Sequence, residues 1–211
     1  MFEVNKKDFY FFKNKINPDE DTIYKLKKFV SLLGDYQKNL NLIGKSTIPN
    51  IWSRHILDSA QIENILPEEN DSYITVDVGT GAGFPGMVLA AMGRKDLLLC
   101  EKSKKKNIFL NAVAKECNLK VKIYNDNIEN LRASNIRTII SRAFSPLKSL
   151  ILKVRNCMRY DTTLVLHKGR NYMKEIIEAK SLFCFNYKCY DSVTNIDAKI
   201  LKIDNIKEKN E

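Results

Sequence analysis

Apolar residues in the first third of the chain recur every three or four positions, which is the spacing of one face of a helix. The clearest run comprises Ile23, Leu26, Phe29, Val30 and Leu33. Acidic residues at 19–21 precede it, where the helix dipole favours negative charge. We also expect a short aromatic-rich helix at 9–15 and another helix at 49–66. Residues 1–70 are therefore expected to form a helical segment packed on the remainder.

From residue 71 the period changes, and short β-branched or apolar runs alternate with helical stretches. Strands are expected at 74–78, 97–100, 121–124, 138–140 and 163–166. Helices are expected between them at 87–92, 107–117 and 147–158. This alternation predicts a doubly wound, mostly parallel sheet, so residues 71–211 should form a Rossmann-like α/β domain. Two further strands at 183–190 and 199–203 should add a hairpin-like pair, with 207–211 frayed.

The 211 residues are 44% apolar and 28% charged, with 8 Gly and 5 Pro. This composition fits one globular core and excludes collagen-like and disordered chains. Residues 1–70 hold 10 basic and 10 acidic side chains, whereas residues 71–211 hold 25 and 15, so the net charge of +10 belongs to the second part. A basic field attracts polyanions, which makes nucleic acid or an anionic membrane surface a candidate partner. A solubilising basic surface explains the charge equally well.

The five cysteines include no C-x-x-C pair, and the chain has only two histidines. These counts give little support to a zinc finger or a disulfide framework, so we expect no metal site and a reducing compartment. Cys100 and Cys157 lie in apolar runs and are expected to be structural thiols. No apolar stretch approaches the length of a membrane span, and the first residues lack the apolar core of a signal peptide. The sequence thus predicts a cytoplasmic protein without a membrane partner.

The most informative segment is the glycine-rich stretch 77–86, Asp-Val-Gly-Thr-Gly-Ala-Gly-Phe-Pro-Gly, between the first expected strand and a helix. Glycine is needed where the backbone turns sharply or lies against a ligand. The G-x-G-x-x-G spacing from Gly81 satisfies the dinucleotide fingerprint, but Pro85 removes a backbone N–H that would hold a pyrophosphate. The D-x-G-x-G-x-G spacing from Asp77 instead resembles the first motif of S-adenosylmethionine-dependent methyltransferases. Under both interpretations Glu101, which ends the second strand, can accept hydrogen bonds from two ribose hydroxyls.

Three further segments point to one family. Residues 54–59 read Arg-His-Ile-Leu-Asp-Ser, residues 140–144 read Ile-Ser-Arg-Ala-Phe, and Lys-Gly at 168–169 follows the fifth strand. With the glycine loop, and in this order, they resemble the RsmG (GidB) family of bacterial methyltransferases, which act on guanine N7 in 16S rRNA. The resemblance covers about residues 36–170. It implies a Rossmann-like methyltransferase fold, S-adenosyl-L-methionine as cofactor, and 16S rRNA or the assembling 30S subunit as partner.

The resemblance also implies roles for individual residues. It carries cofactor contacts over to Gly79, Phe84, Ile128, Glu129 and Arg142. The loop and strand pattern adds Gly81 and Glu101. One departure is at 41–43, where the family commonly reads Asn-Leu-Thr and this chain has Asn-Leu-Ile, which removes a hydroxyl group.

The residues after the fourth strand bear on which atom is methylated. Enzymes for exocyclic amines carry N/D-P-P-Y/F there, and cytosine C5 enzymes need a Pro-Cys nucleophile. This chain has Ser-Arg-Ala-Phe-Ser-Pro and no Pro-Cys. Guanine N7 offers a lone pair and carries no proton, so its methylation needs in-line positioning without a catalytic acid or base. Arg142 and Lys168 are expected to hold the target nucleotide or its phosphate, with the cofactor carboxylate as the alternative partner of Arg142.

Two other groups of residues have both a functional and a structural explanation. His55 and Asp58 share a helical face like an acid–base dyad, but docking of the helices onto the sheet is the favoured explanation. The basic residues around the second strand form either a solvated face or rRNA phosphate contacts: Lys102, Lys104, Lys105, Lys106, Arg94 and Lys95. Beside a methyltransferase loop we favour rRNA contact, with Lys104 and Lys105 among the contacting residues. The alternatives to a methyltransferase are an NAD-dependent oxidoreductase and a non-catalytic RNA-binding module. We expect a monomer.

Overall fold

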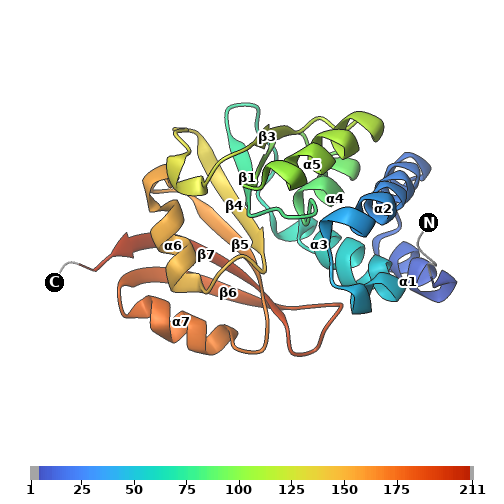
Figure 1. The fold of residues 1–211 in the computed structure, drawn as a ribbon. Helices are drawn as coiled ribbons and strands as arrows, with labels where there is room; N and C mark the ends of the chain where they lie inside the picture. Colours follow the sequence, from blue (N-terminus) through green and yellow to red (C-terminus); the bar gives the residue numbers. More distant parts are fainter. Residues whose placement is uncertain (1–4, 210–211) are drawn as a thin grey trace.

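The computed structural model describes residues 5–209, which form a seven-stranded sheet with helices on both faces (Figure 1). The strands are β1 (Ile74–Val78), β2 (Leu97–Cys100), β3 (Lys122–Tyr124), β4 (Ile136–Arg142), β5 (Thr163–Lys168), β6 (Phe183–Asp191) and β7 (Lys199–Glu208). Their order across the sheet is β3-β2-β1-β4-β5-β7-β6. The first five are parallel, and β7 is antiparallel between β5 and β6. The predicted doubly wound, mostly parallel α/β fold is confirmed.

Helices cover both faces of the sheet. α4 (Gly86–Ala91) and α5 (Lys104–Glu116) lie on one face, and α6 (Leu147–Val154) and α7 (Tyr172–Lys180) lie on the other (Figure 1). Each face has its own buried cluster, with Leu89 and Phe109 in the first and Leu150 and Ile176 in the second. Because the central strands are buried on both sides, their sequences are nearly continuous apolar runs.

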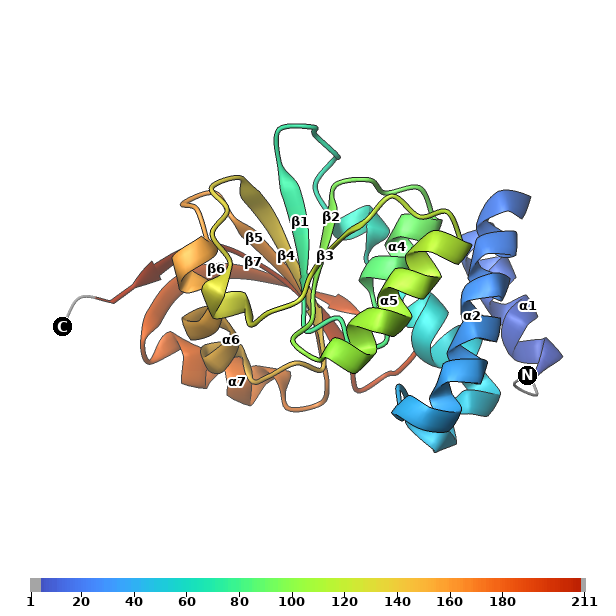
Figure 2. The same cartoon turned by 45° about the horizontal axis from the view of Figure 1, so that its top comes forward.

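The helices of the first 70 residues pack outside α4 and α5 (Figure 2). They are α1 (Lys6–Ile16), α2 (Glu20–Leu40), η1 (Lys45–Asn50), η2 (Trp52–Leu57), α3 (Asp58–Ala60) and η3 (Glu63–Ile65). Asp19 accepts a hydrogen bond from the Thr22 N–H at 2.7 Å, which caps α2 where acids were expected. The buried carboxylate of Asp8 accepts hydrogen bonds from the N–H groups of Trp52 and Ser53 at 2.8 and 3.1 Å. Asp8 thereby fixes α1 onto η2.

Three local features differ from the sequence-based expectation. The helix expected at 49–66 is divided into the 3₁₀ turn η1, the π-helical segment η2, α3 and the 3₁₀ turn η3. Helix α7 has no counterpart among the expected elements. Strand β7 continues to Glu208, which pairs with Phe183, so the expected fraying at 207–208 is wrong, while 210–211 lie outside the described residues. None of the helices between residues 5 and 209 is long and apolar enough to cross a membrane.

Candidate active site

The glycine loop leaves the end of β1 and turns beside the carboxyl end of β2. Its backbone is left-handed at Gly79, Gly81 and Gly83, with φ of +68°, +60° and +89°, a conformation that costs other residues about 1–2 kcal/mol. The N–H groups of Gly79 and Thr80 donate to the carbonyl of Cys100 at 3.0 and 3.2 Å, which fastens the loop to β2. The turn itself therefore requires glycine at these three positions.

The buried side chain of Asp77 stabilises this loop through hydrogen bonds. Its side chain is completely buried, and Oδ2 accepts hydrogen bonds from the Thr80 hydroxyl at 2.5 Å and the Gly86 N–H at 2.8 Å. Burial raises the pKa of Asp77 to about 6, because the charged form loses its hydration. A Cβ atom on Gly86 would lie 2.8 Å from the same carboxylate oxygen. The acid and the last glycine of the motif thus maintain the shape of the loop.

A cavity of about 280 Å³ opens at the carboxyl ends of β1, β2 and β4, and we refer to it as the cofactor cavity. Its lining brings together four of the residues predicted to contact the cofactor: Gly79, Glu101, Ile128 and Glu129. Gly81 adjoins the cavity, because its N–H donates to Glu101 Oε2 at 3.1 Å. Ile128, in the 3₁₀ turn η4 (Ile128–Asn130), supplies an apolar wall, and the Glu101 carboxylate supplies acceptors for hydroxyl groups.

Phe84 and Arg142 lie outside the lining of the cofactor cavity. The Phe84 ring is buried, with its centroid 5.2 Å from that of Phe29 and 5.0 Å from that of His55. The Arg142 guanidinium lies over the same ring, 4.9 Å from its centroid. The Phe84 side chain thus packs the N-terminal helices against the glycine loop, and a cofactor contact by this residue stays a prediction.

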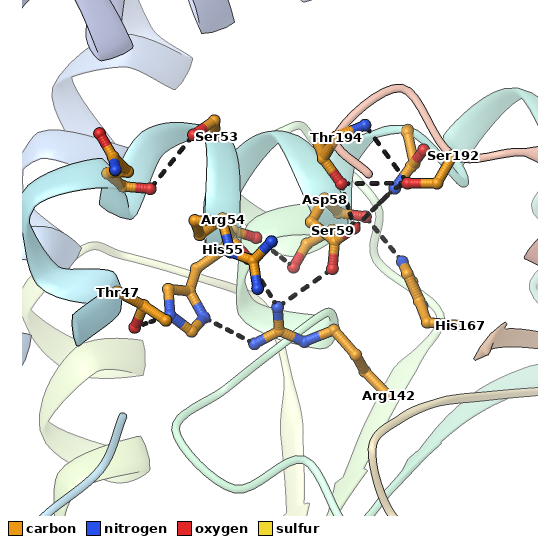
Figure 3. Close-up of polar contacts among 12 residues, drawn as sticks. Thr47, Ser53, Arg54, His55, Asp58, Ser59, Arg142, His167, Ser192 and Thr194 are labelled. Atoms are coloured by element: carbon orange, nitrogen blue, oxygen red, sulfur yellow. Dashed lines mark hydrogen bonds and ion pairs between the residues drawn. The ribbon is translucent and has the colours of Figure 1, made fainter. Parts of the chain in front are cut away.

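The Arg142 side chain, at the end of β4, is held by the N-terminal helices (Figure 3). Its guanidinium donates to Asp58 Oδ2 at 3.2 Å, to His55 Nδ1 at 2.8 Å and to the Arg54 carbonyl at 3.1 Å. Because arginine can only donate, His55 Nδ1 accepts, and its Nε2–H donates to the Thr47 hydroxyl at 2.7 Å. Burial and the Arg142 charge lower the pKa of His55 to about 3. This arrangement supports docking of the helices as the role of His55 and Asp58.

A second cavity, of about 380 Å³, surrounds this network between η2, the ends of β4 and β5, and the loop from β6 to β7. We refer to it as the polar cavity, because most of the residues that line it are polar. The Thr194 hydroxyl, in that loop, donates to Asp58 Oδ1 at 2.7 Å (Figure 3). Sequence reasoning missed Thr47 and Thr194, because each is an isolated polar residue and Thr194 is 136 positions from its partner. Distant segments of the chain thus close the polar cavity together.

Lys168, which ends β5, borders the polar cavity but its ammonium group is already engaged. The side chain is buried, and Nζ donates to Glu175 Oε2 at 2.7 Å and to the Ser145 carbonyl at 2.9 Å. The same Glu175 oxygen accepts a hydrogen bond from the Leu147 N–H at 2.8 Å. Lys168 and Glu175 therefore clamp the loop after β4, and a nucleotide contact by Lys168 stays a prediction.

The expected basic strip is only partly present. Lys104 and Lys105 are exposed in the first turn of α5, and Lys102 and Lys106 line the cofactor cavity. Arg94 and Lys95 precede β2, whose four residues span about 13 Å, so they lie at the opposite edge of the sheet. Arg94 is also buried and paired with Asp96 at 2.7 Å. The prediction that Arg94 and Lys95 form one strip with the lysines is therefore wrong.

Burial makes the thiols and the second histidine near the site poor nucleophiles and bases. Burial raises the pKa of the Cys100 and Cys157 thiols to about 12 and about 11, which keeps them protonated and inert. Burial lowers the pKa of His167, so this imidazole is neutral. Asp77 has a pKa of about 6, but it is enclosed beneath the glycine loop and does not line the cofactor cavity. Chemistry that needs a base with a pKa near 7 is therefore poorly served here.

We expect His55 to make the protein less stable in acid. The folded-state pKa is about 3 and the unfolded value is 6.5, so between these values only the unfolded chain binds the proton. Lowering the pH from 7.5 to 5 should then reduce the free energy of unfolding by about 2 kcal/mol through this residue alone. His55→Gln, which keeps a donor and an acceptor, should lose correspondingly less. Urea titrations of both proteins at both pH values test this, and equal losses would contradict it.

The molecule has a Rossmann-like α/β fold with the cofactor cavity at the carboxyl ends of its parallel strands. A solved protein of Methanococcus maripaludis described as an S-adenosyl-L-methionine-dependent methyltransferase matches with a TM-score of 0.56 at 11% identity, over 86% of this chain and 93% of that one. The chain belongs to the rRNA small subunit methyltransferase G (GidB) family, whose model matches residues 22–203.

Curated relatives agree with this assignment. Ribosomal RNA small subunit methyltransferase G of Rickettsia felis is 37% identical over 88% of this chain and 95% of its own length. The protein of the same name from Orientia tsutsugamushi is 38% identical over 89% and 92%. Membership of this family sets aside the oxidoreductase and the non-catalytic module as alternatives.

The cofactor cavity fits S-adenosyl-L-methionine in its chemistry. Its lining provides carboxylate oxygens at Glu101, an apolar side chain at Ile128 and, at Gly79, a backbone without a Cβ. That these residues would hold the ribose hydroxyls, the adenine and the methionine end, respectively, stays a prediction. These features require no phosphate-binding helix N-terminus, which Pro85 weakens in this chain. When bound, the cofactor supplies a methyl group activated by its sulfonium.

Proposed function

We propose that this protein methylates N7 of a guanine in small-subunit (16S) rRNA. The observation that carries the substrate class is its identity of 37–38% over nearly the full length of relatives named ribosomal RNA small subunit methyltransferase G. The choice of N7 is supported by the site itself, whose buried histidines and thiols are unsuited to removing a proton. A site whose histidines and thiols cannot act as bases suits an acceptor atom that carries no proton.

The reaction balances without proton transfer. The lone pair of guanine N7 forms a bond to the methyl carbon while the bond from that carbon to sulfur breaks, and neutral S-adenosylhomocysteine leaves. The positive charge moves from sulfur to the methylated base. The protein's contribution is alignment of the two reactants, which can supply much of the rate enhancement.

Arg142 is proposed to position one of the reactants. Its guanidinium is anchored by Asp58 and His55 on one side and by the Phe84 ring on another, and it lines the polar cavity. Such anchoring lowers the entropic cost of holding a phosphate or a carboxylate. Guanine N7 must stay free to react, so a phosphate, guanine O6 or the cofactor carboxylate is the proposed partner.

The first turn of α5 is proposed to contact rRNA phosphates. It holds Lys104, Lys105 and Lys106 with no acid, although the dipole disfavours cations at a helix N-terminus. The double variant Lys104→Ala/Lys105→Ala should reduce the slope of log affinity against log salt by about 1.4, because each of two phosphate contacts on single-stranded RNA contributes about 0.7. Lys120→Ala/Lys122→Ala, at the opposite edge of the sheet, is the matched control. A slope that the first pair leaves unchanged would reject the contact.

The decisive experiment uses 30S subunits from cells that lack this activity. Purified protein and labelled S-adenosyl-L-methionine should introduce label into 16S rRNA, and chemical cleavage specific for N7-methylguanine should cut at one position. No label in 16S rRNA, with S-adenosylhomocysteine binding intact, would reject the proposed substrate, and naked rRNA and tRNA would be tried next. We further propose that the protein acts as a monomer in the cytoplasm, on 16S rRNA or the assembling subunit.

A further inference from the structure

A third cavity, also of about 280 Å³, adjoins the cofactor cavity at Ala143 and Phe144, which line both. We refer to it as the acceptor cavity. The loop after β4 and the end of β5 form its walls, and its lining includes Ser141, Ser145 and His167. The mechanism above assigns no role to this cavity.

Two polar atoms in the lining residues of the acceptor cavity are buried without a hydrogen-bond partner in residues 5–209. They are Ser145 Oγ and His167 Nδ1. Buried polar atoms are nearly always paired, because an unpaired one carries a free-energy cost. Two of them in one lining indicate that a polar ligand supplies the missing partners.

The geometry around His167 fixes which kind of partner it needs. Its Nε2 lies 2.6 Å from the Asp58 carbonyl, which can only accept, so Nε2 carries the hydrogen (Figure 3). The Nδ1 atom is therefore a hydrogen-bond acceptor that awaits a donor. Burial lowers the pKa of His167, which keeps Nδ1 unprotonated at neutral pH.

The loop that carries Phe144 is held in a strained conformation. Ala143 has a left-handed backbone with φ of +53°, which is unfavourable for a residue with a Cβ. The Phe144 ring lies so close to Gly79 that a Cβ built there would be 2.2 Å from its Cδ2. Lys168 holds the Ser145 carbonyl on the other side of the loop. These contacts place an aromatic ring at the boundary between the two cavities.

We propose that the acceptor cavity is the subsite for the target guanine, with Phe144 stacked on the base and Ser145 and His167 bonded to its edge. This inference rests on the proposed function. Guanine that presents N7 to the cofactor directs its N1–H and N2–H donors away from it. In the sheet, β4 lies between β1 and β5, and His167 is in β5. His167 is therefore on the side toward which the N1–H and N2–H donors of the guanine would point.

The subsite also discriminates between purines. An acceptor such as His167 Nδ1 pairs with guanine N1–H, but it opposes adenine N1, which is itself an acceptor. The Ser145 hydroxyl can donate to guanine O6. Stacking on Phe144 favours any flat base, so the two polar atoms determine which base is accepted.

Ser145→Ala tests the subsite, because a structural role and a recognition role predict opposite results. If the hydroxyl is only an unpaired buried group, its removal should leave activity unchanged. If it bonds the base, kcat/KM for 30S subunits should fall about tenfold while the Kd for S-adenosylhomocysteine and the Tm are maintained. Ser149→Ala, in α6 and outside the lining, is the matched control. Unchanged kcat/KM in Ser145→Ala would overturn the proposal.

A binding measurement separates failure of the subsite from failure of the proposed function. Protein saturated with S-adenosylhomocysteine is titrated with guanosine or adenosine 5′-monophosphate and followed by NMR. We expect the guanine nucleotide to bind at least about fivefold more tightly, and Ser145→Ala to remove the difference. Equal affinities, or no binding of the guanine nucleotide, would overturn the subsite whatever the rRNA result. Selective binding without methylation of 30S subunits would retain the subsite and reject the rRNA substrate.

Discussion

Gly79→Ala is expected to abolish binding of S-adenosyl-L-methionine and with it all methyl transfer. The new Cβ would lie 2.2 Å from Phe144 Cδ2, far inside van der Waals contact, and φ at this position is +68°. The backbone strain alone costs about 1–2 kcal/mol, and displacement of the ring deforms the cofactor cavity on top of it. Calorimetric titration with S-adenosylhomocysteine measures the loss.

Two further variants separate strain from steric conflict. Gly93→Ala also places a Cβ at positive φ, +111°, but finds no atom within 4 Å, so it should lower Tm and leave cofactor affinity intact. Gly79→Ala combined with Phe144→Ala removes the conflict and should recover part of the lost affinity, since contacting residues are not additive. If the double variant binds no better than Gly79→Ala, the contact with Phe144 is not the cause.

Arg142→Ala is expected to lower kcat/KM for 30S subunits about 100-fold, equivalent to about 2.7 kcal/mol. The variant removes the proposed positioning group and also leaves Asp58 and His55 without their shared donor. Arg142→Lys keeps the charge but loses the forked geometry and should recover little of the activity. Unchanged kcat/KM for both RNA and cofactor would reject the role.

The N-terminal helices should contribute to the positioning of Arg142, and so to kcat/KM, through Asp58. In a double-mutant cycle with Asp58→Asn and Arg142→Ala, we expect the two losses of kcat/KM to be less than additive. The reason is that Arg142 Nη1 and Asp58 Oδ2 are 3.2 Å apart, so the two side chains act as a unit. The Kd for S-adenosylhomocysteine then distinguishes the two partners proposed for Arg142. A large rise in that Kd assigns it to the cofactor carboxylate, whereas an unchanged value assigns it to the RNA.

The sheet and the cofactor loop were predictable because their signals are local. The inner parallel strands β2, β1, β4 and β5 are short, mostly buried runs. In the loop, Gly79, Gly81 and Gly83 are needed because the turn has positive φ angles at these positions. Glu101, Ile128 and Glu129 then converge with Gly79, since they all lie at the carboxyl edge of the sheet. Helix α7 went unpredicted, although Ile176 and Ala179 bury one of its faces.

The remaining site residues depend on contacts between distant segments. The sequence suggests that Arg94 is another surface cation. It is instead buried against Asp96, at the amino ends of the parallel strands and away from the cofactor cavity. Lys168 is engaged by Glu175, and Phe144 lies over Gly79 next to a left-handed Ala143. No local sequence pattern indicates either contact. Long-range packing overrides the charge pattern at these positions.

The order of the last two strands has a consequence for synthesis of the protein on the ribosome. β6 is synthesised before β7, but its neighbour in the sheet is β7. It can therefore join the edge of the sheet only after β7 has paired with β5. The loop between them supplies Thr194 to Asp58, so the polar cavity cannot close earlier. A nascent chain can therefore assemble its cofactor loop well before it can close the polar cavity.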